Sequence, residues 1–204
     1  MVVIGGGAAG MVCAIAAARS GAKVLLLEKM ERPGRKILIT GKGRCNITNT
    51  KPWAEFSSHI NPNKKFLKHS FHFFSNSDTI AFFESLGLPC NVERGDRVFP
   101  ASGKSSSVVD VLVKEMDRLK VIQNYNTSVS GFLFNGSAIS GVITSKGVFD
   151  CAAVVVATGG LSYPATGSQG DGYRMAREAG HSITPLFPSL TALMPAGYNG
   201  DAKG

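Results

Sequence analysis

The sequence has 204 residues, 44% of them hydrophobic, which is enough for one ordinary core and perhaps a second small lobe. Its 24 glycines follow no Gly-X-Y period, which excludes a collagen-like fibre and indicates many tight turns. The four cysteines form no CxxC pair, so a reduced cytoplasmic setting is favoured over a disulfide framework. The longest apolar run, residues 8–18, is too short to span a bilayer, so we expect no membrane anchor.

The net charge of +8 is concentrated in one region. Residues 29–51 contain seven lysines and arginines and one acid, Glu31, so they hold six of the eight net charges. Such a block is typical of a solvated basic face or a phosphate site. This distribution disfavours bulk nucleic-acid binding even before the motifs are considered.

The chain begins with the pattern of a βαβ unit. A short apolar segment (MVVI) leads into the glycine turn GGGAAG, and an alanine-rich helix follows that ends at Gly21. Residues 24–27 are continuously apolar, as in a strand buried on both faces. Residues 30–77 show weak periodicity and many turn residues, which indicates loops with short helices.

Two helices and a set of strands follow. Helices are predicted at 78–86, ended by Gly87, and at 105–119, with a serine N-cap. Residues 121–157 read as an antiparallel β-meander, with hairpin turns at 135–136 and 146–147, that feeds a buried parallel strand at 154–157. A last helix is predicted at 170–179. The fold class is therefore α/β, a Rossmann-like domain with a parallel central sheet and an antiparallel meander.

The glycine turn carries a dinucleotide-binding motif. Gly5, Gly7 and Gly10 fit G-x-G-x-x-G between a strand and a helix, and Glu28 ends the next strand, where a carboxylate can accept hydrogen bonds from a ribose. The three glycines would make the turn, admit the pyrophosphate and let helix and strand pack, while the helix N-terminus offers N–H groups to the anion. A carboxylate at the ribose repels the 2′-phosphate of NADP, so FAD or NAD is favoured.

Three longer stretches resemble a known family. They are GRKILITGKGRCNITN (34–49), RVFPASGKSSSVVDVL (97–112) and VVVATGGLSYPATGSQGDGYRMAREAGH (154–181). Together they look like the bacterial flavoproteins described as BaiN-like or aminoacetone oxidase family NAD(P)/FAD-dependent oxidoreductases. The resemblance covers essentially the whole chain and implies the FAD-binding architecture of glutathione-reductase and fumarate-reductase flavoproteins.

The resemblance also implies which residues contact each part of FAD. The pyrophosphate would be contacted by Gly5, Gly7, Ala9 and Gly10, and from the other side by Arg35 and Lys36. The adenosine would be contacted by Glu28, Lys29 and the backbone of Val129. The group near the ribityl chain and flavin is Arg44, Cys45 and Asn46. The turn closing over the cofactor is Ala157, Thr158 and Gly159, and the helix start of the fumarate-reductase type is Gly170, Asp171 and Gly172.

The implied activity is flavin redox chemistry in which NAD(P)H gives hydride to the flavin, which passes electrons to a small organic acceptor or oxygen. Relatives in this family are about twice as long. The resemblance therefore implies that residues 1–188 form an FAD-binding domain that lacks its C-terminal strand, and that residues 189–204 begin an inserted second domain. The chain is expected to be a fragment of such an enzyme.

Other motifs of the sequence do not support a different function. A P-loop is rejected because Val98 stands where its first glycine is needed. A zinc site at His69 and His72 is disfavoured, and no metal is expected. The phenylalanines at 71, 73, 74, 82 and 83 are read as core, and the lysines at 64, 65 and 68 as a solvated face.

Two other functions stay open. An RNA-associated flavoprotein similar to tRNA-modifying enzymes is the second hypothesis, because the chain is basic. A plain NAD-dependent dehydrogenase is the third and is disfavoured, because the meander and the ATGG and GDG segments have no role in it. Cys45 is read as packing near the flavin rather than as a reactive thiol, which its cationic neighbours would otherwise favour. Tyr163 is a candidate proton donor.

Overall fold

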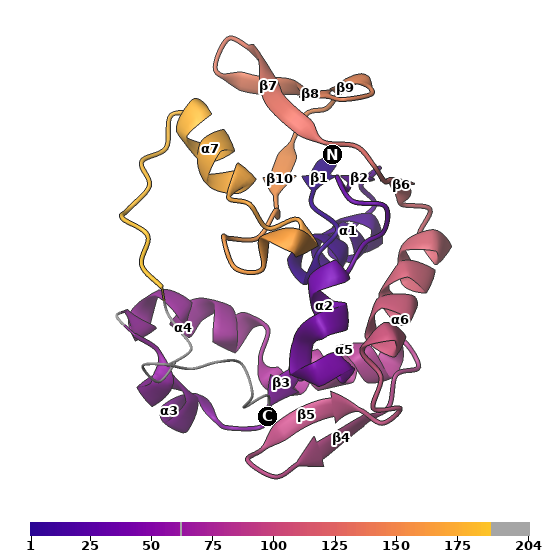
Figure 1. Cartoon of the computed structure of the whole chain (residues 1–204), viewed down its shortest axis with the longest axis vertical. Coiled ribbons are helices and arrows are strands. Elements are labelled where there is room, and N and C mark those ends of the chain that lie inside the picture. The colour runs from indigo at the N-terminus through magenta and orange to yellow at the C-terminus, as the bar shows by residue number, and fades with distance from the viewer. Residues whose placement is uncertain (62, 189–204) are drawn as a thin grey trace, which may run out of the picture.

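The structure is a computed structural model that describes residues 1–61 and 63–188 (Figure 1). A four-stranded, all-parallel sheet lies at its centre. In sheet order its strands are β10 (Val154–Val156), β1 (Val2–Ile4), β2 (Leu25–Leu27) and β6 (Ile122–Asn124). The chain leaves β1 on one side toward β2 and returns on the other side as β10. The carboxyl ends of β1 and β10 therefore form a topological switch point, where ligands bind in open α/β sheets.

The two faces of this sheet face two separate cores. Val3 and Leu26 point to a core shared with α1 (Ala8–Arg19) and α6 (Ser105–Arg118). Val2, Ile4 and Leu27 point to a second core formed with the β-meander and α7 (Asp171–Glu178). The alternation follows from the two-residue period of a strand. It confirms the expected Rossmann-like arrangement, in which both faces of the parallel sheet are covered.

The remaining strands of the described residues form two smaller antiparallel sheets. The meander comprises β7 (Val129–Asn135), β8 (Ala138–Thr144) and β9 (Gly147–Asp150). The other sheet has the order β3 (Thr48–Asn49), β5 (Arg97–Pro100) and β4 (Cys90–Glu93). Figure 1 shows these two sheets at opposite ends of the molecule, with the parallel sheet and α1 between them.

The segment between β2 and β4 consists largely of short helices, as predicted. They are α2 (Arg35–Ile39), the 3-10 helix η1 (Thr40–Gly43), α3 (Trp53–Phe56), the 3-10 helix η2 (Ser57–His59), α4 (Lys64–Phe73) and α5 (Asn76–Ser85). A further 3-10 turn, η3 (Pro164–Thr166), precedes α7. Helix α5 starts two residues before its predicted start because Ser75 and Asp78 form a capping box.

Three expectations about elements were wrong. The predicted strand from residue 121 splits, because Asn126 turns the chain at φ 51°, and its first part joins the parallel sheet as β6. Helix α6 has no serine cap: its N-cap is Lys104, and the Ser105 hydroxyl instead donates to the Leu38 carbonyl, at 3.0 Å. Strand β10 pairs only with β1 in the described sheet, so it is an edge strand, and Val156 is 41% exposed rather than buried.

The reading of the phenylalanine cluster as core was also wrong in part. Phe83 is buried, but Phe73 and Phe74 are exposed. The expected solvated face at Lys64, Lys65 and Lys68 is confirmed, since all three are exposed. Within residues 1–61 and 63–188, no helix is long and apolar enough to cross a bilayer, and no group of three or more His, Cys, Asp or Glu side chains is placed to hold a metal. The segment 189–204, predicted to begin a second domain, lies outside the described residues.

Candidate functional site

A cavity of about 840 Å³ lies at the carboxyl ends of the parallel strands. The residues that follow β1, β2 and β10 form one side of it, and α2 and the loop before α7 form the other. This is the switch point between β1 and β10. Of the predicted site residues, the lining includes Gly5, Gly7, Ala9, Glu28, Lys29, Arg35, Lys36, Cys45, Asn46, Val129, Ala157, Thr158, Gly159 and Asp171.

The structure requires glycine at two of the three motif positions in the glycine turn. Gly5 has φ +105°, and a Cβ there would lie 2.5 Å from the carbonyl oxygen of Ala157. A Cβ on Gly10 would lie 1.8 Å from the carbonyl oxygen of Gly5, so only glycine lets α1 pack this closely on the strand. At Gly7 a Cβ would meet nothing within 4 Å. Two glycines thus serve packing, and the third leaves open space at the N-terminus of α1.

The carboxylate of Glu28 is held by the backbone. Its two oxygens accept hydrogen bonds from the N–H groups of Gly6, at 2.6 Å, and Met30, at 2.8 Å. These bonds fix the carboxylate beside the glycine turn at the end of β2. Each carboxylate oxygen can accept a further hydrogen bond, so a ribose hydroxyl can still be bound.

Three cationic side chains connect the α2 side of the cavity to the loop before α7. Lys29 lies 2.6 Å from the Asp171 carboxylate, and Lys36 donates to the Ser168 hydroxyl at 2.7 Å. Arg35 pairs with Glu31 at 2.6 Å and donates to the Ala165 carbonyl at 3.1 Å. The predicted phosphate residues Arg35 and Lys36 therefore contact the loop before α7, and the predicted adenosine residue Lys29 contacts the predicted helix start at Asp171, although more than 100 residues separate the partners in each case.

The turn after β10 carries a buried polar group. The hydroxyl oxygen of Thr158 is buried and has no hydrogen-bond partner among the described residues. Gly172 lies against it, since a Cβ at that position would be 2.6 Å from the hydroxyl oxygen. Gly170, with φ +87°, packs against Leu161 in the same way. The structure thus gives Gly170 and Gly172 a packing role, and neither lines the cavity.

The predicted flavin-side residues are divided. Cys45 and Asn46 line the cavity, but the Arg44 guanidinium is not part of the lining: it pairs with the carboxylate of Glu93 and lies 4.4 Å from the centre of the Phe99 ring. With its amide nitrogen turned toward the sheet, Asn46 donates to the carbonyl of Thr48, at 2.9 Å. Burial raises the pKa of the Cys45 thiol above its ordinary value. A neutral, buried thiol fits the packing interpretation rather than the reactive one.

The sequence interpretation missed part of the lining. The omitted residues include Arg32, Gly34, Thr40, Thr79, Phe83, Thr127, Ser128, Gly167 and Ser168. Gly34 could have been noticed in the sequence as a glycine in the basic block. The structure shows why glycine is needed there: its φ is +73°, and the Val109 side chain approaches its Cβ position to 2.6 Å. Ser168 could not have been noticed, since a single serine in a loop has no local pattern.

These residues fit an extended dinucleotide such as FAD. The open space at Gly7 lies at the N-terminus of α1, which has no side-chain cap and no acid in its first turn, so its N–H groups are available to an anion. Lys36, which donates to a serine hydroxyl, adds positive charge at the same cavity, whereas Lys29 and Arg35 are paired with Asp171 and Glu31. The Thr158 hydroxyl, buried at its edge, is available as a further donor or acceptor.

Fold and site together define a Rossmann-type dinucleotide-binding domain. The family described as "HI0933-like protein Rossmann domain" matches residues 1–196. The chain therefore belongs to this family, and the resemblance seen in its motifs is confirmed.

Relatives and solved structures agree with this assignment. The 3-dehydro-bile acid delta(4,6)-reductase of Clostridium scindens is 39% identical, over 98% of this chain and 51% of the relative. The ribosomal RNA dihydrouridine synthase of Escherichia coli is 32% identical, over 93% of this chain and 46% of the relative. The chain thus spans about half the length of the curated relatives it matches.

Two solved structures share the fold. A 3-ketosteroid-delta4-(5alpha)-dehydrogenase from Rhodococcus jostii superposes with a TM-score of 0.63 at 18% identity, over 79% of this chain and 46% of the other. A flavocytochrome c3 fumarate reductase superposes with a TM-score of 0.61 at 21% identity, over 87% of this chain and 40% of the other. The expected kinship with the fumarate-reductase type of Rossmann domain is confirmed at the level of fold.

Proposed function

We propose that this chain is the FAD-binding part of an oxidoreductase that moves hydride from NAD(P)H through the flavin to a small organic acceptor or oxygen. The observation that carries this proposal is the open space at Gly7, at the N-terminus of α1, beside the held carboxylate of Glu28. This pair of features suits a pyrophosphate followed by a ribose. The bound flavin supplies the redox chemistry, and the protein binds and orients it.

Each group of side chains has a distinct task in this proposal. The N–H groups of α1 and the cations Arg35 and Lys36 neutralise the pyrophosphate, and Glu28 binds the adenosine ribose. The backbone of Val129 borders the adenine, and the turn at 157–159 closes the site. Cys45 and Asn46 shape the flavin end. Residues 1–188 form this domain in the proposal, and 189–204 lead into a second one.

The acceptor belongs to the same proposal. A relative 39% identical to this chain is named for reduction of a 3-dehydro-bile acid. We propose by analogy an apolar, unsaturated carbonyl compound as acceptor. Its pocket would also involve the half of the relative's length that this chain does not cover.

Cofactor analysis of the purified full-length protein tests the proposal. We expect one FAD per chain by absorbance and by chromatography of the released cofactor, and anaerobic bleaching of the flavin bands on addition of NADH or NADPH. Protein that carries no flavin after incubation with excess FAD would overturn the proposal. If FAD binds but neither NADH nor NADPH reduces it, the assignment of NAD(P)H as the electron donor is wrong, while the assignment of FAD stands.

RNA as the substrate is a second candidate. Two relatives, from Escherichia coli and Haemophilus influenzae, are named ribosomal RNA dihydrouridine synthases and are 32% and 29% identical to this chain. The lysines of α4 are exposed, and exposed lysines can bind the phosphates of a nucleic acid. Appearance of dihydrouridine in ribosomal RNA incubated with the enzyme and NAD(P)H would support this candidate, and reduction confined to small carbonyl compounds would dismiss it.

A further inference from the structure

The loop before α7, residues 160–170, has its two ends joined. It leaves the turn after β10 and returns to the start of α7, where the Gly170 N–H donates to the Gly160 carbonyl at 3.2 Å. Gly159 and Gly170 flank the loop with φ of +77° and +87°, values that glycine adopts without strain. A compact loop with joined ends and glycines at its base can pivot as a unit, as the lids of active sites do.

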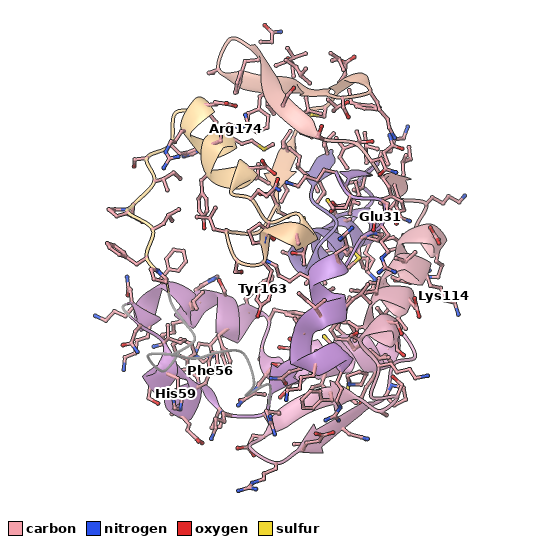
Figure 2. All side chains as sticks on the ribbon, in the orientation of Figure 1. Glu31, Phe56, His59, Lys114, Tyr163 and Arg174 are labelled. Carbon is pink, nitrogen blue, oxygen red and sulfur yellow. The ribbon has the colours of Figure 1, made fainter. Side chains whose placement is uncertain are left out.

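The 160–170 loop buries little apolar surface. Residues 161–165 are all exposed, and the large side chains among them, Leu161 and Tyr163, are 52% and 67% exposed. Figure 2 shows Tyr163 pointing from the loop away from the parallel sheet. Gly167 lies against the Met30 side chain. A segment with so few buried apolar contacts opens at a low free-energy cost, so its polar contacts largely decide how often it opens.

These polar contacts join the loop to lysines that line the cavity. The Lys36 ammonium donates to the hydroxyls of Ser168, at 2.7 Å, and Ser162, at 3.4 Å. The Lys29 ammonium donates to the side-chain oxygen of Gln169, at 3.1 Å. Each contact joins two groups of the protein, so it forms without a cofactor. All three acceptors are uncharged, and a phosphate oxygen is a stronger acceptor than any of them.

Lys36 can hold the loop and an anion at the same time. Helix α2 starts beside the glycine turn, since the Gly34 N–H donates to the Gly6 carbonyl at 2.8 Å, and Lys36 lines the cavity two residues further on. A lysine ammonium has three N–H donors. Two of them are directed to Ser168 and Ser162, which leaves one for a phosphate in the cavity.

We infer that residues 160–170 form a lid over the cofactor, and that the hydrogen bond from Lys36 to Ser168 holds this lid closed. The lid opens about Gly159 and Gly170 to admit the dinucleotide. A phosphate bound by Lys36 then restrains the ammonium in the position from which it holds Ser168, so cofactor binding favours closure. Ser168 is a positioning residue, because it acts through Lys36. The inference deepens the proposed FAD site and rests on it.

The rates of FAD binding to the full-length apoprotein, followed by stopped-flow flavin fluorescence, test this inference. Ser168→Ala removes the acceptor and keeps the cation. It should raise both the association and the dissociation rate constants ~10-fold, because a lost hydrogen bond to a charged group makes the lid open more often. The matched control is Ser130→Ala on β7, an exposed serine whose hydroxyl donates to the Ile143 carbonyl, and it should leave both rates unchanged.

Two further variants separate the parts of the inference. Lys36→Met loses the phosphate contact as well as the contact to the lid, so it should raise the dissociation rate further than Ser168→Ala does. Gln169→Ala changes an exposed residue and removes one acceptor of Lys29, so it should raise both rates even if Ser168→Ala does not fold. Hydrogen exchange of the peptide covering 160–170 should slow when FAD binds to the wild type, and slow less in Lys36→Met.

The failure of the lid and the failure of the FAD proposal are distinguishable. If Ser168→Ala raises the dissociation rate alone, the serine contacts the cofactor directly and the lid is wrong. If Ser168→Ala and Gln169→Ala change neither rate, these contacts do not hold the loop, while FAD binding stands. Equal dissociation rates in Lys36→Met and Ser168→Ala would overturn the link between phosphate and lid. A wild-type protein that binds no FAD would overturn the proposed function, and the lid with it.

Discussion

The ammonium of Lys29 lies 2.6 Å from the carboxylate of Asp171, although 142 residues separate the two in the chain. Lys29 follows the ribose-binding candidate Glu28 at the end of β2, and Asp171 is the first residue of α7. The contact fixes the loop before α7 over one edge of the cavity. The coupling energy between Lys29 and Asp171 therefore measures how strongly this contact holds the loop at the cavity.

A double-mutant cycle with Lys29→Met and Asp171→Asn should give a coupling energy of about 1 kcal/mol in urea unfolding, since both side chains are partly buried (24% and 30% exposed). The control pair Arg174 and Glu178 lies on the same helix but is 44% and 45% exposed, and it should give about 0.3–0.5 kcal/mol. Both values should fall with added salt, the control more steeply. Equal coupling in the two pairs would contradict a closing role for Lys29 and Asp171.

Substitution by alanine should have different effects at Gly7 and at Gly10: at Gly7 it should mainly weaken FAD binding, and at Gly10 it should mainly destabilise the fold. Gly7→Ala places its methyl group in open space at negative φ, so it should cost only about 1 kcal/mol of stability, mainly through the weaker N-cap. It should nevertheless weaken FAD binding by ~10-fold or more, because the methyl group occupies the proposed pyrophosphate position. Thermal unfolding and fluorescence titration of the apoprotein with FAD measure the two effects.

Gly10→Ala is the matched variant, because its methyl group would meet the Gly5 carbonyl oxygen at 1.8 Å. It should cost about 3 kcal/mol or more and lower the yield of folded protein. If Gly7→Ala binds FAD normally, the pyrophosphate lies elsewhere, whatever the stability of Gly10→Ala.

Local patterns explain why much of this site was predictable. The turn at Gly5, Gly7 and Gly10, the strand ending at Glu28 and the helix after Gly170 each depend on a few neighbouring residues. Glycine periodicity and apolar runs record such short-range geometry directly. The parallel sheet followed from these units, because a βαβ connection permits few arrangements.

Long-range pairing explains what was missed. Arg44 lies in a basic block that suggested a ligand, yet it pairs with Glu93, 49 residues away, and the sequence has no signal for that choice. Ser105 was expected to cap α6, but its hydroxyl bonds to the Leu38 carbonyl, 67 residues earlier. Strand β6 looked continuous with β7 because the break at Asn126 depends on a positive φ that asparagine adopts only in some contexts.

Glu115 on α6 predicts an acid-sensitive contribution to stability. Hydrogen bonds from Arg118 and Arg19, opposed by burial, lower the pKa of its carboxyl from 4.5 to about 2. A carboxyl with a lowered pKa stabilises the fold above its unfolded pKa, and this stabilisation is lost as the pH falls from about 4.5 to about 2. At neutral pH Glu115→Gln should therefore cost at most about 3 kcal/mol.

Urea unfolding at a series of pH values measures this difference. The gap between wild type and Glu115→Gln should be constant above about pH 5 and close toward about pH 2. Glu178→Gln, an exposed glutamate paired with one arginine, serves as the control and should show a gap below about 1 kcal/mol. A gap for Glu115→Gln that does not depend on pH would show that lost packing, not charge, is responsible.

We expect the Cys45 thiol to take part in packing and not in covalent chemistry. Burial raises its pKa, and the neighbouring guanidinium of Arg44 is engaged by Glu93 and does not offset this. Alkylation of Cys45 by iodoacetamide at neutral pH should therefore be roughly tenfold or more slower than that of a free cysteine, and should become normal in urea. Mass spectrometry of the labelled peptides measures the rate for each cysteine separately, so Cys13, which also has a raised pKa, is an internal comparison.

The variant Cys45→Ala completes this test. It should keep the FAD absorbance and the rate of flavin reduction by NAD(P)H within about threefold, because a neutral thiol supplies no nucleophile. Cys45→Ser has nearly the same size and should behave alike. If Cys45→Ala keeps its FAD but loses turnover with the acceptor while flavin reduction is unchanged, then the thiol acts on the acceptor, and the raised pKa of the free protein does not describe the complex.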